Sequence, residues 1–194
     1  MPIHKTNGFT LIEFLVVLGI LALTVGSALL FLTSTLRGTN QANVTAEVKQ
    51  NGQVVLDSLE RQIRGAISAT ELIGSGAPAG SSSAISLALP EGKYFFVACF
   101  NSVGITSNGW IGTVSSTSSS TPGAGQYVPL TNRDRTSGVE IVCDSFRVTS
   151  ASSGALNPPI VRVSFTVNQG VGAPSRSDFK ANVKFDTTIS LRKY

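Results

Sequence analysis

The longest run of hydrophobic positions lies close to the N-terminus. Nineteen consecutive residues, Phe14 to Leu32, carry no charge and are nearly all apolar. A helix rises about 1.5 Å per residue, so a run of this length can cross the roughly 30 Å hydrocarbon core of a bilayer. We therefore predict a membrane-spanning helix over about 14–32.

Beyond this run the hydrophobic positions become periodic. Apolar residues recur at spacings of four and seven, which is the pattern of a helix with one buried face. The predicted apolar stripe consists of Val44, Val48, Val55, Leu59, Ile63 and Ile67, with Ala66 beside it. Because no proline occurs between Pro2 and Pro78, one continuous helix is expected from about Thr10 to about Ser68.

A segment rich in Gly, Ser and Pro, residues 74–83, ends the helical pattern, and the period then changes to two. Alternating apolar and polar residues predict half-buried strands, and connections without helices favour antiparallel pairing. The predicted strands cover residues 84–89, 94–101, 110–114, 139–149, 160–168 and 179–192. The expected fold class is α+β, with a long N-terminal α-helix, membrane-spanning and then amphipathic, packed on a mainly antiparallel β-sheet domain.

A short polar leader and a carboxylate precede the apolar run. Residues 1–8 are weakly basic, and residues 8–13 read Gly-Phe-Thr-Leu-Ile-Glu. Glu13 opens the apolar helix, and a carboxylate at the edge of a membrane span is costly unless it has a partner. This string at the head of an apolar run resembles the class III signal of type IV pilins and type II secretion pseudopilins.

The resemblance implies a processing site and an assembly site. A membrane prepilin peptidase would cut between Gly8 and Phe9 and methylate the new Phe9 amine. The Glu13 carboxylate would then meet the Phe9 ammonium of a neighbouring subunit, because opposite charges attract strongly in a low dielectric and either one alone is costly there. The expected divisions are a removed leader (1–8), an N-terminal helix (9–68) and an extracytoplasmic β-rich globular domain (69–194).

The C-terminal strands carry a second, less specific part of the resemblance. Residues 139–148, 159–167 and 185–192 are similar to the end of minor pilins and of J-type pseudopilins. The apolar segment also has no proline, unlike that of many main filament subunits of this family. These features favour a minor structural subunit of a type IV pilus or pseudopilus, while surface pilus, secretion pseudopilus and competence pilus all remain open.

The implied partners are prepilin peptidase, other pilin or pseudopilin subunits through the N-terminal helix, the inner-membrane assembly platform, and the lipid bilayer before assembly. His4 and Lys5 precede the span, and the positive-inside tendency keeps that end in the cytoplasm. The protein is thus expected in the cytoplasmic membrane as a single-pass precursor with its C-terminal domain outside. It would then enter a periplasmic or surface filament.

Both cysteines fall in the exported part. Cys99 and Cys143 lie in strand-like sequence, and disulfides form and persist outside the cytoplasm, so we predict that the two are joined. The alternative is two buried thiols that act as small hydrophobes.

Composition argues against catalysis. The formal net charge is only +4, and the sole histidine, His4, lies in the predicted leader. A processed chain would therefore have neither a histidine base nor a histidine metal ligand. No enzyme activity, cofactor or metal is expected.

Other interpretations compete with this one. The apolar run could be a cleaved secretory signal peptide with its site at residues 26–28, or a simple signal anchor. The chain could also be a signal-anchored binding module that is not assembled into a filament and recognises a ligand or DNA. In the DNA case Arg133 and Arg135 would contact phosphate, and Trp110 or Phe100 would stack on bases.

Overall fold

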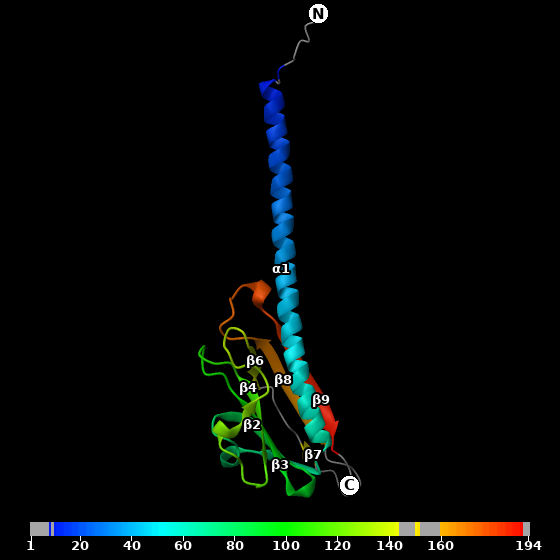
Figure 1. The fold of residues 1–194 in the computed structure, drawn as a ribbon, viewed down its shortest axis with the longest axis vertical. Helices are drawn as coiled ribbons and strands as arrows, with labels where there is room; N and C mark the ends of the chain where they lie inside the picture. The colour runs from blue at the N-terminus through cyan, green and yellow to red at the C-terminus, as the bar shows by residue number, and fades with distance from the viewer. Residues whose placement is uncertain (1–7, 9, 144–149, 152–159, 192–194) are drawn as a thin grey trace, which may run out of the picture. The chain divides into compact units, whose positions relative to one another are not determined.

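The computed structural model describes residues 8, 10–143, 150–151 and 160–191, and the chain divides into two compact units, residues 1–40 and 41–194 (Figure 1). Helix α1 (Leu11–Arg64) runs through both, from Leu11 in the first unit to Arg64 in the second. The predicted long helix and antiparallel sheets are both present, so the α+β fold class is confirmed.

Helix α1 ends at Arg64 and not at the predicted Ser68. Gly65 and Ala66 form the final turn, in which the Ala66 N–H donates to the Ile63 carbonyl oxygen at 3.1 Å. The Ile67 N–H then donates to the Ala88 oxygen at 2.8 Å, which begins a strand pairing. Ile67 was predicted to be part of the apolar stripe but is 46% exposed, because the chain has already left the helix.

Val44, the first residue of the predicted stripe, is only half-buried. Apart from Ile67, the other predicted residues form the helical side of the core. The buried residues are Val48, Val55, Leu59, Ile63 and Ala66. Gly52 lies in the same row and is buried. A Cβ built on Gly52 would overlap the ring of Phe185, so the missing side chain lets the helix approach a strand closely.

The first sheet has five strands that pair in chain order, each antiparallel to the next. These are β1 (Ser68–Leu72), β2 (Ser81–Ala88), β3 (Tyr94–Phe100), β4 (Trp110–Ser116) and β5 (Val128–Pro129). Strands β1 and β5 were not predicted, since neither segment shows a clear alternation of apolar and polar residues.

The second sheet is built around one central strand. It contains β6 (Val139–Val142), β7 (Ser150–Ala151), β8 (Ile160–Gln169) and β9 (Asn182–Ser190). Strand β9 pairs with β8 along nearly its whole length, while β6 and β7 pair antiparallel with opposite ends of β8. The described part of the chain thus has two antiparallel sheets where the sequence suggested one.

Strand boundaries differ from the prediction at several places. Strand β2 begins at Ser81, inside the segment 74–83 that was expected to contain no strand, and β4 continues to Ser116 instead of residue 114. The strand expected over 139–149 is described as far as Cys143, and its remainder lies outside the described residues. The strand expected from Phe179 begins at Asn182, because Ser177–Phe179 form a 3-10 turn in which the Lys180 N–H donates to the Ser177 oxygen. The other described 3-10 turns are Gly74–Gly76, Pro90–Gly92 and Ala124–Gln126.

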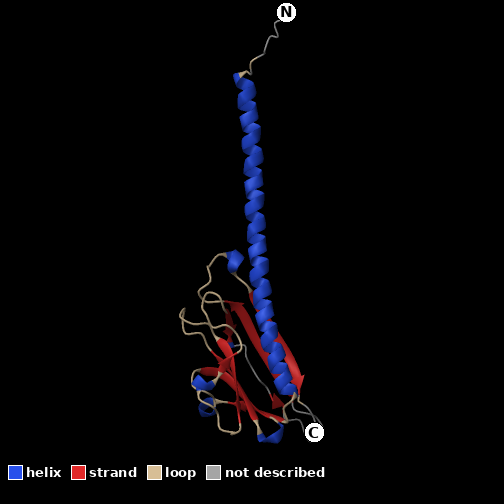
Figure 2. Ribbon diagram, in the orientation of Figure 1, coloured by secondary structure: helices blue, strands red, loops and turns tan. Residues whose placement is uncertain are grey.

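Two apolar clusters hold the second unit together. The larger joins the buried face of α1 to side chains of both sheets, and Figure 2 shows this helical segment lying against the strands. The smaller covers the other face of the first sheet and contains Ala84, Phe96, Ala98, Phe100, Trp110 and Tyr127. The first sheet is therefore apolar on both faces.

Candidate functional site

The predicted processing and assembly residues lie at the start of α1. Gly8 is exposed, and Phe9 lies outside the described residues. Thr10 caps the helix, because its side-chain oxygen accepts a hydrogen bond from the Glu13 N–H at 3.4 Å. Its carbonyl oxygen accepts the first helical bond from the Phe14 N–H at 3.2 Å. The backbone at Glu13 is therefore fixed within the first turn.

Thr10 was not singled out from the sequence. Thr10 and Glu13 have the Ser/Thr-x-x-Glu spacing of a capping box, so this signal could have identified the cap. An acidic side chain in the first turn also interacts favourably with the positive end of the helix dipole. Glu13 thus stands where local geometry already favours a negative charge.

The helix around Glu13 is apolar on every side. Leu11, Ile12 and Phe14 are 83%, 72% and 59% exposed, and no residue of its most apolar 18-residue window is buried. The mean hydropathy of that window is 2.7, and α1 is long and apolar enough to cross a membrane. A soluble core helix would bury such a surface, whereas this one offers it to lipid or to other helices.

The hydroxyl groups inside the apolar stretch are satisfied by the helix itself. Thr24, Ser27 and Thr33 donate to the carbonyl oxygens of Leu21, Thr24 and Leu30, each at 2.9 Å. An unsatisfied hydroxyl is expensive in hydrocarbon, so these bonds make the segment compatible with a bilayer.

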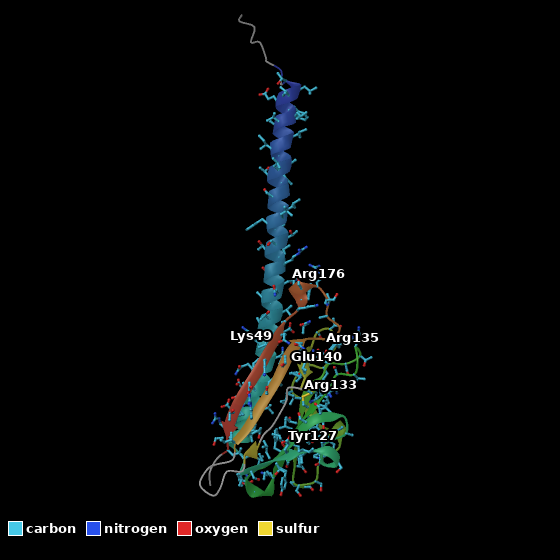
Figure 3. All side chains as sticks on the ribbon, turned by 180° about the vertical axis from the view of Figure 1, so that it is seen from behind. Lys49, Tyr127, Arg133, Arg135, Glu140 and Arg176 are labelled. Atoms are coloured by element: carbon cyan, nitrogen blue, oxygen red, sulfur yellow. A yellow bond between two sulfur atoms is a disulfide. The ribbon has the colours of Figure 1, made fainter. Side chains whose placement is uncertain are left out.

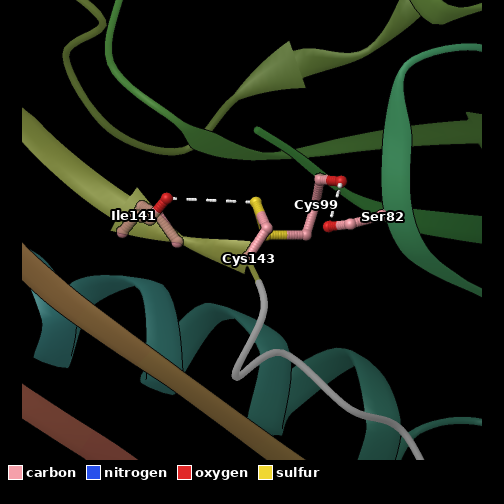
Figure 4. Close-up of a disulfide and its surroundings, with 4 residues drawn as sticks. All are labelled: Ser82, Cys99, Ile141 and Cys143. Carbon is pink, nitrogen blue, oxygen red and sulfur yellow. Dashed lines mark hydrogen bonds between the residues drawn. A yellow bond between two sulfur atoms is a disulfide. The ribbon is translucent and has the colours of Figure 1, made fainter. Parts of the chain in front are cut away.

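The two cysteines are joined by a disulfide, with their Cα atoms 5.6 Å apart. Cys99 lies in β3, and Cys143 directly follows β6, so the bridge links the two sheets (Figure 4). Both residues belong to the larger cluster and are 0% and 2% exposed. The Ser82 hydroxyl lies 3.5 Å from the Cys99 carbonyl oxygen, and Cys143 Sγ lies 3.9 Å from that of Ile141.

The residues considered for DNA binding are arranged differently from that hypothesis. Phe100 and Trp110 are stacked with centroids 4.2 Å apart and are only 6% and 7% exposed. Arg133 lies 4.4 Å above the Trp110 ring. Because the two rings are buried in the smaller cluster, they are not available to stack on bases.

Tyr127 completes this aromatic group. Its ring meets Phe100 edge-on at 5.5 Å, and burial raises the pKa of its hydroxyl to about 12. Within the described residues the hydroxyl has no hydrogen-bond partner. The group is thus an apolar packing cluster that keeps Tyr127 neutral.

The part of the chain that the structure describes contains no group of three or more His, Cys, Asp or Glu side chains placed to hold a metal ion.

Comparison with protein families gives one finding, at the N-terminus. The family described as the prokaryotic N-terminal methylation motif matches residues 3–29. This range includes Gly8, Phe9 and Glu13 and most of the apolar stretch, as far as Leu29. Comparison with curated proteins and with solved structures gave no significant match. The chain therefore carries a type IV pilin-like prepilin signal, a prokaryotic N-terminal methylation motif, at the head of its apolar helix.

Proposed function

We propose that the protein is a minor structural subunit of a type IV pilus or pseudopilus, assembled through its N-terminal helix. The observation that carries this proposal is the methylation motif, which includes the start of a helix whose apolar side chains are exposed on every side. A motif of this kind marks a precursor for prepilin peptidase, and the helix supplies the surface that neighbouring subunits would cover.

Processing would act on the Gly8–Phe9 bond. Cleavage there removes the polar leader, leaves Phe9 as the new N-terminus and places its amine one residue before the Thr10 cap. Methylation of an amine keeps its positive charge, so the charge pair with Glu13 remains possible afterwards.

Glu13 would align subunits. Its side chain projects from an apolar helix and has no ion-pair partner among the described residues. In a filament core the ammonium of a neighbouring Phe9 would supply that partner, and the register that joins the charges would be favoured over its alternatives.

In this proposal the precursor spans the cytoplasmic membrane once, over about residues 14–32, with the second unit outside. It acts as a structural subunit, and its partners are prepilin peptidase, other pilins or pseudopilins and the inner-membrane assembly platform. The disulfide between the two sheets of the second unit supports this orientation, because Cys99 and Cys143 then lie in an oxidising compartment.

The assembly role is tested by Glu13→Ala in the native host. The variant should be cleaved normally and remain in the membrane. It should be depleted at least about tenfold from sheared filaments or pseudopili, because the Phe9 ammonium of a neighbouring subunit would be buried without the Glu13 carboxylate as its partner. Glu47→Ala is the matched control, because Glu47 is an exposed carboxylate on the same helix but in the second unit.

Fractionation at equal expression gives the readout, with cleavage after Gly8 verified in each variant. Equal incorporation of the Glu13→Ala and wild-type chains would refute the intersubunit charge pair. A processed chain that never enters a filament would favour the signal-anchored binding module.

A further inference from the structure

Three loops meet at one end of the second unit. They are residues 101–109 between β3 and β4, residues 130–138 between β5 and β6, and residues 170–181 between β8 and β9. In Figure 1 they lie at the end of this unit where its segment of α1 begins. We call this surface the loop face.

Asn108 joins the three loops. It is 0% exposed, its side-chain N–H donates to the Asp134 carbonyl oxygen at 2.6 Å, and its side-chain oxygen accepts from the Val171 N–H at 2.8 Å. The Gly172 N–H donates to the Arg135 oxygen at 2.8 Å. The loops are therefore one connected platform.

The loop face carries an excess of positive charge. Its four exposed cations are Arg133, Arg135, Arg176 and Lys180, and its two carboxylates are Asp134 and Asp178, which leaves a net charge of +2 (four minus two). Figure 3 shows Arg135 and Arg176 at this end of the unit and Tyr127 towards the other.

The two carboxylates are already engaged. Asp134 Oδ1 accepts from the backbone N–H groups of Thr136 and Ser137, at 2.9 and 2.8 Å. Asp178 is 6% exposed and is paired with Arg176. Arg135 and Lys180 have no ion-pair partner among the described residues and remain available to an external anion.

The same platform presents two large apolar side chains. Val103 and Ile105 are 68% and 70% exposed in the 101–109 loop. Hydrogen bonds within this loop fix its backbone. The Thr106 N–H donates to the Val103 carbonyl oxygen at 3.0 Å, and Val103 and Ser107 form an isolated antiparallel β-bridge. Exposed aliphatic residues beside cations are the combination that binds a bilayer interface.

Chain connectivity brings the loop face to a membrane. The proposed span ends at Leu32 and the second unit begins at Gln41, so eight residues, 33–40, separate them. Eight residues cover about 12 Å as a helix and at most about 28 Å when extended. The end of the unit that contains Gln41 therefore stays near the lipid headgroups whatever the angle between the two units.

We propose that the loop face docks on anionic phospholipid headgroups at the outer surface of the membrane, with Arg135 and Lys180 on phosphates and Val103 and Ile105 at the interface. This docking rests on the proposed membrane anchoring of the precursor and applies before assembly. The membrane-spanning segment keeps the second unit close to the bilayer, so docking of the loop face is an intramolecular event. A surface of modest charge is therefore sufficient. Each basic residue near such a surface changes the docking equilibrium by about fivefold.

The test is hydrogen–deuterium exchange of the full chain in lipid nanodiscs. Amides of residues 101–107 and 132–137 should exchange more slowly in discs that contain phosphatidylglycerol than in discs of phosphatidylcholine alone. The Arg135→Gln/Lys180→Gln variant should lose this difference, and Ile105→Ser should weaken it. High salt should also remove it.

Arg64→Gln/Lys93→Gln is the matched control. It also removes two exposed cations, Arg64 in the last turn of α1 and Lys93 directly before β3, which are paired with Glu60 and Glu91. This variant should keep the lipid-dependent protection.

The outcomes separate docking from anchoring. Protection of residues 14–32 without lipid-dependent protection of the loops would refute docking and leave the anchoring intact. Rapid exchange throughout residues 14–32 would overturn both. If Arg135→Gln/Lys180→Gln and Arg64→Gln/Lys93→Gln lost the same protection from exchange, the effect would be one of overall charge. That result would also refute docking through the loop face.

Discussion

The local role of Thr10 as a helix cap is separate from the intersubunit role proposed for Glu13. Thr10 binds the backbone N–H of Glu13 and does not bind its carboxylate, so the cap survives when the Glu13 side chain is removed. The Glu13→Ala variant should therefore keep the Thr10 cap at the start of α1, while it loses the carboxylate that interacts with the helix dipole and is the proposed partner of the Phe9 amine. This separation is what makes its assembly phenotype interpretable.

The disulfide supports a prediction about stability. Cys99→Ala/Cys143→Ala should lower the free energy of unfolding by about 2–5 kcal/mol, because the bridge closes a loop of 44 residues between the two sheets. Denaturant unfolding in detergent can be followed by fluorescence of the single tryptophan, Trp110. Two thiols that alkylate freely in the native protein would contradict the bridge.

Asp134 supports a prediction about pH. The Ser137 N–H, followed by the Thr136 N–H and the Ser137 hydroxyl, holds the pKa of this carboxyl below its usual 3.8. Because the folded pKa is depressed, its contribution to stability is present above the unfolded pKa and is lost as pH falls through the folded value. An NMR titration should give a midpoint below 3.8, and Ser137→Ala should raise it. A midpoint at or above the usual value would exclude this hydrogen bonding.

At the scale of elements, the contact between α1 and β9 depends on Gly52. Phe185 lies over Gly52 and stacks on Phe165 with centroids 5.3 Å apart, so its ring has little room to move. Gly52→Ala should destabilise the second unit by about 1–3 kcal/mol through overpacking, despite the better helix propensity of alanine.

Gly38→Ala is the control for this substitution. Nothing lies within 4 Å of a Cβ built at Gly38, so the change should be neutral or slightly stabilising. Thermal unfolding of both variants measures the difference, and a Phe185→Leu second change should partly restore the Gly52→Ala protein. Equal stability of the two alanine variants would show that the close approach is unimportant.

The elements also show what could be predicted from sequence. The period of Val48, Val55, Leu59 and Ile63 identified the buried face of α1, because a helix repeats every 3.6 residues and needs no distant partner to reveal it. Strands in which apolar and polar residues alternate regularly, such as β8, could be predicted from the sequence in the same way. Strand β5 has only two residues and depends on its pairing with β4, which no local pattern contains.

Contacts between distant segments were the part that could not be predicted. Asn108 looks like an ordinary turn residue, and its importance arises only when residues 134 and 171 fold beside it. The same holds for Gly52, whose neighbour Phe185 is far away in the chain. At the N-terminus the candidate site was local in sequence, which is why Gly8, Phe9 and Glu13 could be proposed before the fold was known.

At the scale of the whole molecule, the two units have complementary requirements. Residues 1–40 expose an apolar helix that needs lipid or other helices, while residues 41–194 bury their own core and join their sheets by a disulfide. A precursor held in the membrane and later transferred into a filament satisfies both requirements. The methylation motif at residues 3–29 supports the processing step of this proposal.

The central claim is processing at this signal, and mass spectrometry of the protein purified from its native host tests it most directly. The N-terminal peptide should begin at Phe9 and be heavier than the unmodified peptide by one methyl group on its amine. Gly8→Val should block cleavage and leave the precursor intact, because a branched side chain replaces hydrogen beside the bond that is cut. A wild-type protein that retains Met1, or that begins near Leu29 after removal of the apolar run, would contradict the account.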